Sequence, residues 1–164
     1  MIPARLDSPF VAHPDGAERT RLSGPGLRSF RAIADLWGLT EAQRIAVLGE
    51  PPRSTYHAWM KKARAGEALT LPHDTLLRIS AILGIHKALS ILFNDPAQAL
   101  AWLTGPHRGT VFRGASPLTF ITEGAQDGMM TVRRTLDGWR GGHIGHGAAE
   151  GSFTPVTEDD VVFL

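Results

Sequence analysis

Four basic side chains gather in one short stretch of the chain, which Glu50 and Glu67 flank. Residues 51–66 contain Arg53, Lys61, Lys62 and Arg64 and no aspartate or glutamate, which gives the stretch a local charge of +4. Guanidinium and ammonium groups clustered in this way can pair with the phosphates of a nucleic-acid backbone. A run of lysine and arginine is also the ordinary appearance of a solvent-exposed helix face, so the charge alone leaves both interpretations open.

Histidine and glycine patterns give little support for a metal site or an enzyme. His143 and His146 have H-x-x-H spacing, but they lie among glycines with no carboxylate at ligand spacing, so we expect no metal. The glycine-rich strings at 24–26 and 141–147 lack the preceding strand and following helix of a phosphate-binding loop. No serine has a nucleophile-elbow context, and no carboxylate has an apolar setting that would perturb its pKa. We therefore expect no catalytic residue and no cofactor.

The chain as a whole has an ordinary globular composition. Its 164 residues are 43% hydrophobic and carry a net charge of +1, so a nucleic-acid surface has to come from local clustering of charge. The absence of cysteine excludes disulfides, thiolate zinc sites and cysteine nucleophiles. No apolar leader and no apolar run of membrane-spanning length is evident, so we expect a cytoplasmic protein with no membrane partner.

The basic stretch falls on the second helix of a helix-turn-helix pattern. Apolar residues recur at helical spacing from Leu27 to Trp37, and Thr40 with Gln43 predicts a capping box for a short helix that ends at Gly49. Two prolines follow, and RSTYHAWMKKAR then predicts a helix with a polar leading end. In this layout the leading side chains face base edges and the later basic side chains face phosphates. The first group is Arg53, Ser54, Thr55 and His57, and the second group is Lys61, Lys62 and Arg64.

The second half of the chain contains a start signal for nearly every helix. Residues 76–93 are apolar almost all round, which predicts a central buried helix, bent at Gly84. Asp95-Pro96 and Ser116-Pro117 each place an N-cap before a proline in the first turn. We expect Leu100 and Trp102 to lie in the core.

A glycine-rich connector and one further helix complete this half. We expect Val111-Phe112 to form a brief extended piece, and Asp127 to cap a last helix that ends near Arg140. Trp139 is the tryptophan that we expect to be partly exposed. The predicted fold class is all-α, with about seven short helices and almost no sheet.

The ends of the chain differ in composition from its middle. Residues 1–26 are rich in proline and predict a flexible arm, and residues 144–164 predict a flexible tail that is acidic and then apolar. Between them we expect a helix-turn-helix domain at 27–93 and a second helical unit at 94–143.

Two strings carry a resemblance to a known family. LFNDPAQALAWL, followed by a glycine, SPL and a last helix with VRRTLD, is similar to the C-terminal toxin-binding domain of the Xre/MbcA/ParS antitoxins. GLTEAQRIAVLGEPPRSTYHAWMKK resembles the Xre-like N-terminal domain of the same family. Two features depart from the family pattern: Pro52 stands where a polar helix cap is expected, and the chain continues beyond Gly142.

The resemblance implies the antitoxin of a type II toxin–antitoxin pair. Its partner would be a RES-domain toxin that consumes NAD, neutralised by direct binding and occlusion without chemistry by the antitoxin. The helix-turn-helix would bind the operator of its own gene pair as a homodimer within a hetero-oligomeric complex. The resemblance also places the toxin contact on the C-terminal half, where a cationic, aromatic helix end followed by glycines suits a cleft built for a pyrophosphate. The residues proposed for this contact are Arg133, Trp139, Arg140, Gly141, Gly142 and His143.

Two other classes of protein fit the same sequence. One is a DNA-binding transcriptional regulator whose C-terminal half senses a ligand or a protein. The other is a protein-interaction module with a degenerate helix-turn-helix, which would bind no DNA despite its basic stretch.

Overall fold

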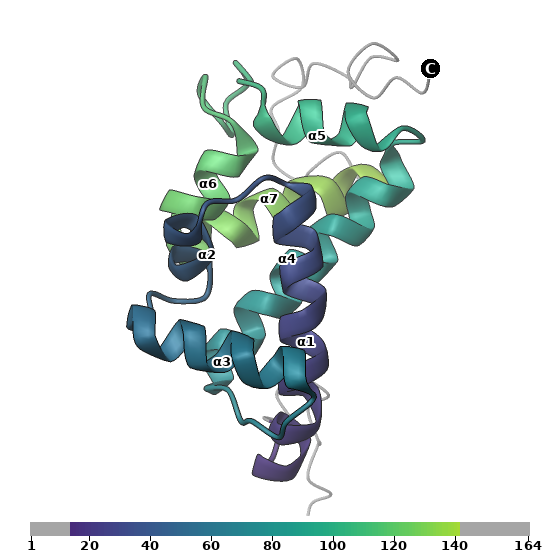
Figure 1. Ribbon diagram of the computed structural model, residues 1–164. Helices are drawn as coiled ribbons and strands as arrows, with labels where there is room; N and C mark the ends of the chain where they lie inside the picture. Colours follow the sequence, from purple (N-terminus) through teal and green to yellow (C-terminus); the bar gives the residue numbers. More distant parts are fainter. Residues whose placement is uncertain (1–13, 142–164) are drawn as a thin grey trace, which may run out of the picture.

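The computed structural model describes residues 14–141, which fold into seven α-helices without a strand (Figure 1). This confirms the predicted all-α class. The helices are α1 (Gly16–Leu36), α2 (Glu41–Val47), α3 (Arg53–Ala65), α4 (His73–Leu92), α5 (Pro96–Thr104), α6 (Pro117–Glu123) and α7 (Ala125–Arg140).

The two longest helices, α1 and α4, lie side by side and form the spine of the molecule (Figure 1). Helix α3 crosses one end of α1, and α7 packs along α4. Helix α2 contacts α6, so the two halves of the chain also meet away from the spine. A single hydrophobic core runs through both halves, from Leu27 on α1 to Leu136 on α7.

Helix α1 begins well before the position expected from the sequence. The prediction of a flexible arm up to residue 26 is wrong for residues 16–26, which are helical and include Pro25. The Asp15 carboxylate caps the helix by accepting from the Glu18 N–H at 2.8 Å. Ser23 is buried, and its hydroxyl accepts from the Leu71 N–H at 2.9 Å. The bond between Ser23 and Leu71 is a tertiary contact that the sequence pattern alone does not reveal, and it helps to offset the local cost of a proline inside the helix.

Helix α4 is continuous through Gly84, so this glycine does not interrupt the helix. The glycine serves the packing of α7 instead, because a Cβ at this position would lie 2.9 Å from Cζ of Arg133. The prediction of a central buried helix is confirmed, since α4 packs against both α1 and α7.

Among the described helices, α4 is also the one long and apolar enough to cross a membrane, by length and composition only. The expectation that no apolar run reaches this length is therefore not met. The core helix of a globular fold satisfies the same criterion, and α4 packs against both α1 and α7.

Most helix starts follow their predicted caps. Thr40 and Gln43 form the full capping box at α2, and the side chains of Asp95 and Ser116 cap α5 and α6. The expected cap at Asp127 is wrong, because α7 already begins after Gly124 and the exposed Asp127 lies in its first turn. Pro52 precedes α3 without a side-chain cap, as its lack of a polar group requires.

Candidate functional site

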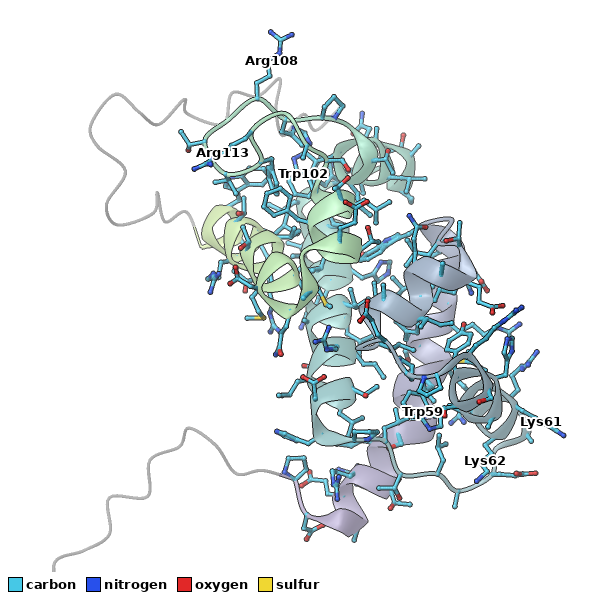
Figure 2. The ribbon with its side chains drawn as sticks, turned by 90° about the vertical axis from the view of Figure 1, so that its left-hand side faces the viewer. Trp59, Lys61, Lys62, Trp102, Arg108 and Arg113 are labelled. Carbon is cyan, nitrogen blue, oxygen red and sulfur yellow. The ribbon has the colours of Figure 1, made fainter. Side chains whose placement is uncertain are left out.

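Helix α3 presents a basic face to the solvent. Tyr56 and Met60 are buried against the core, whereas the four basic side chains point away from it. Figure 2 shows Lys61 and Lys62 projecting from one end of the molecule, with Trp59 packed on the inner side of α3. The residues of α3 that the sequence assigns to DNA are all exposed apart from the half-buried Thr55, namely Arg53, Ser54, His57, Lys61, Lys62 and Arg64.

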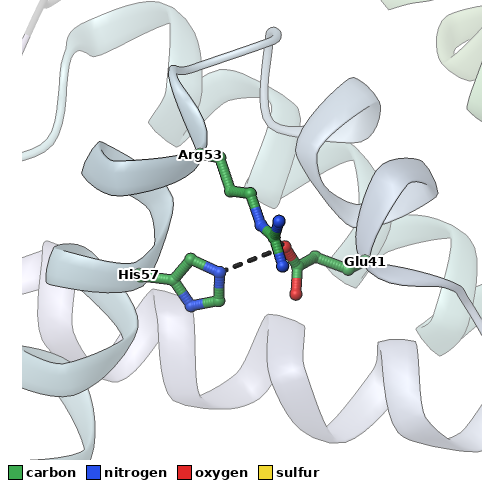
Figure 3. Close-up of polar contacts among 3 residues, drawn as sticks. All are labelled: Glu41, Arg53 and His57. Carbon is green, nitrogen blue, oxygen red and sulfur yellow. Dashed lines mark hydrogen bonds and ion pairs between the residues drawn. The ribbon is translucent and has the colours of Figure 1, made fainter.

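A carboxylate that the sequence analysis did not single out ties the leading end of α3 to α2. Oε1 of Glu41 lies 2.6 Å from Nε of Arg53 and 3.1 Å from Nε2 of His57 (Figure 3). The hydrogen bond from Arg53, helped by His57, holds the pKa of the Glu41 carboxyl below its usual range. Two of the side chains predicted to face base edges therefore share one anchor on the preceding helix. The i, i+4 spacing of Arg53 and His57 on one helix face is the sequence signal that indicates such a shared partner.

The C-terminal half is organised around Trp102, which is 7% exposed. Its ring centroid lies 5.3 Å from that of His107, 5.3 Å from Trp139, 5.9 Å from Phe112 and 6.3 Å from Phe93. Nε2 of His107 donates to the Trp102 carbonyl oxygen at 2.7 Å. The predicted burial of Trp102 is confirmed, whereas Leu100 is 37% exposed and not part of the core.

The residues proposed for toxin contact are only partly grouped at the end of α7. Arg133 and Arg140 both face Asp137, with N–O distances of 3.6 Å and 4.0 Å, so this carboxylate offsets part of their charge. Trp139 is half-buried, as expected, and its inner edge packs on Trp102. Gly141 follows as the C-cap of α7, and Gly142 and His143 lie outside the described residues.

Within the connector between α5 and α6, residues 110–114 form consecutive turns. Val111-Phe112 is therefore not the extended piece predicted from the sequence. The reason is that Phe112 is buried and edge-on to both Trp102 and Phe120, which draws the chain back onto α5 and α6. On the outer side, Arg108 and Arg113 project into the solvent (Figure 2).

An apolar groove of about 520 Å³ opens where the end of α1 meets α4 and α5. Leu36, Trp37, Leu89, Phe93 and Leu100 contribute most of its apolar lining. Within residues 14–141 no group of three or more histidine, aspartate and glutamate side chains is placed to hold a metal. His143 and His146, the pair with H-x-x-H spacing in the sequence, lie outside that range.

The fold and its surfaces define a helix-turn-helix protein with a helical binding unit built onto the same core. Residues 17–84 match the antitoxin Xre-like helix-turn-helix domain, and residues 88–142 match the antitoxin Xre/MbcA/ParS C-terminal toxin-binding domain. The chain belongs to the Xre/MbcA/ParS antitoxin family, and neither of its domains is of an enzymatic kind.

One curated relative extends over most of the chain. It is the protein named uncharacterized protein y4oB of Sinorhizobium fredii (strain NBRC 101917 / NGR234). The two sequences are 43% identical over 116 residues, which is 71% of this chain and 84% of the relative. No solved structure gives a significant match.

Proposed function

We propose that this antitoxin neutralises a RES-type toxin that consumes NAD, by binding over the mouth of its active-site cleft. The observation that carries the proposal is the position of Trp139. It is held half-exposed at the end of α7 by its packing on Trp102, with Arg140 beside it. An aromatic anchor flanked by guanidinium groups is a typical centre of a protein interface, and the same groups suit a cleft whose carboxylates surround a pyrophosphate.

The same protein, in this proposal, binds the operator of its own gene pair as a homodimer and represses transcription in the cytoplasm. Helix α3 supplies the contact, with its leading side chains at base edges and Lys61 and Lys62 at phosphates. The DNA-binding part extends from α1 to the end of α4, and the toxin-binding part extends from residue 94 to His143.

Neutralisation is tested by co-expressing the antitoxin with its cognate toxin and measuring cell growth. A chain that stops after Ile144 keeps all the proposed contact residues and should protect the cells. Arg140→Glu in that chain should abolish protection, because it places a negative charge where the toxin's carboxylates are expected. Full protection by the Arg140→Glu chain would exclude occlusion by the end of α7.

A shorter truncation would not serve this purpose. Stopping after Arg134 removes Leu136, which is fully buried, so a failure to protect could come from unfolding as well as from a missing toxin contact. Arg134→Glu is the matched control. Arg134 is exposed on α7 and faces Asp127 at 3.6 Å, and its reversal should leave protection intact.

DNA binding is tested by titrating the upstream DNA at several salt concentrations. Replacing Lys61 and Lys62 by alanine should weaken binding to all sequences and lower the salt slope by about one for each phosphate that is no longer neutralised. Lys87→Ala, an exposed lysine on α4, serves as the control and should leave the slope unchanged. An unchanged slope in the double variant would refute the assignment of α3.

The second candidate function is a transcriptional regulator whose C-terminal half senses a ligand. The groove between α1, α4 and α5 favours it, because its volume and apolar lining suit a small molecule. The absence of a toxin gene beside this gene, together with a ligand that alters operator affinity, would favour the regulator over the antitoxin with a RES-type partner.

A further inference from the structure

The connector between α5 and α6 carries two arginines that no acidic side chain neutralises within the described residues. We propose that its outer face, made of Arg108, Thr110, Val111 and Arg113, is a second contact surface for the toxin and binds acidic side chains there. This inference rests on the proposed function, and it adds a surface that is separate from the end of α7.

The connector is held in a fixed shape by bonds across its neck. The His107 N–H donates to the Ala115 carbonyl at 3.1 Å, and the Gly114 N–H donates to the His107 carbonyl at 2.7 Å. Inside the neck, the rings of His107 and Phe112 lie 5.8 Å apart and both contact Trp102. A surface that is already ordered loses less conformational entropy when a partner binds.

The backbone next to this neck is strained. Arg113 has a φ of +50°, a left-handed conformation that is costly for a residue with a side chain, and Gly114 follows with a φ of +89°. The N–H of Arg113 donates to the Gly109 carbonyl at 2.9 Å, which closes this turn. The turn directs the Arg113 side chain outward (Figure 2).

The segment that contains the connector carries charge of one sign. Residues 96–122 contain no aspartate or glutamate, and within the described chain neither Arg108 nor Arg113 forms an ion pair. This differs from α7, where Asp137 faces two arginines. Arg108, Arg113 and the intervening backbone line a shallow hollow of about 430 Å³, and Val111 beside it is 43% exposed. Such a hollow accepts a carboxylate through bidentate guanidinium bonds, with an apolar contact next to it.

A protein partner fits this surface better than DNA. Arg108 and Arg113 lie at the end of the molecule opposite Lys61 and Lys62, so one duplex seated on α3 does not reach them (Figure 2). The connector also falls within residues 88–142, the part that matches a toxin-binding domain.

The test uses the full chain and its cognate toxin, with affinity measured by calorimetry at low and moderate salt. Arg108→Glu combined with Arg113→Glu should weaken toxin binding roughly 100-fold at low salt, because like charges would meet across the interface. The double variant should keep the melting temperature of the parent. Arg108→Glu alone changes a residue without a positive φ, so a loss of toxin affinity in this single variant cannot come from misfolding of the turn at Arg113. Arg21→Glu, an exposed residue on α1, is the matched control and should bind as the parent does.

Each outcome decides one point. A lysine in place of an acidic toxin residue should restore binding of the Arg108→Glu variant, which would support a direct contact. Unchanged toxin affinity in the double variant, with the parent binding well, would overturn this inference and leave the proposed function intact. Reduced operator affinity with unchanged toxin affinity would assign the connector to DNA and also overturn it. A parent chain that binds no toxin would overturn the proposed function itself, and this inference with it.

Discussion

Replacing Trp102 by alanine should cost the fold roughly 3–5 kcal/mol in free energy of unfolding. The residue is only 7% exposed, and an aromatic side chain buried in this way removes about 150–250 Å² from water. At about 25 cal/mol per Å² this burial is worth about 4–6 kcal/mol, part of which the alanine methyl retains. The edge-on contacts with Phe112 and Trp139 add about 0.5–1.5 kcal/mol each.

The assay is urea unfolding followed by far-ultraviolet circular dichroism, which does not depend on the tryptophan that is removed. Trp102→Phe keeps a ring in the cluster and should lose less than half as much stability. Trp59→Ala is the control for removing a tryptophan from a half-buried position on α3, and it should also cost less. A Trp102→Ala midpoint equal to that of the parent would mean that the aromatic cluster does not hold the C-terminal half together.

Three further substitutions test particular contacts. Glu41→Gln should lower the stability of the fold at neutral pH, because the variant lacks the ion pair with Arg53. The difference in stability between parent and variant should vanish as the pH falls through the depressed pKa of the Glu41 carboxyl, because protonation then removes the same ion pair from the parent. Parallel stability curves of the two proteins down to that acid range would refute this. Gly128→Ala should destabilise the fold by more than about 2 kcal/mol in a thermal melt, since a Cβ would overlap the Phe120 carbonyl, and a melt like the parent's would contradict the close packing of α6 on α7. Thr40→Ala should cost about 1 kcal/mol by breaking the capping box at α2, and urea titration should show no change if that box is absent in solution.

The parts of the fold that the sequence predicts well are those that local chemistry decides. A capping side chain and its N–H donor lie within three residues of each other, so Thr40, Asp95 and Ser116 identify helix starts without knowledge of the rest. The helical spacing of apolar residues likewise identifies the inner face of α1.

The errors arise where distant residues decide the outcome. Pro25 lies inside a helix, and two residues before it Ser23 accepts from the backbone N–H of Leu71, which is 48 residues away. Gly84 resembles a helix breaker in the sequence, but it leaves room for Arg133 of α7. Neither partner can be identified from a local pattern.

The candidate sites show the same division. The exposed basic face of α3 follows from helical periodicity, whereas the anchoring of its leading end by Glu41 depends on how α2 and α3 meet. The sequence does not single out Arg108, because a glycine-rich connector predicts a loop but not the fixed shape that His107 and Phe112 impose on it.

The shared spine of α1 and α4 has a consequence for the lifetime of the protein in the cell. Since one core serves both halves, the helix-turn-helix and the toxin-binding unit unfold in a single equilibrium rather than as separate modules. A ligand that binds only the folded chain shifts that equilibrium by RT ln(1 + [L]/Kd), wherever on the surface it binds. A protease that acts on the opened chain would then be slowed by any partner that binds the folded chain, and the rate of degradation would depend on all bound partners together.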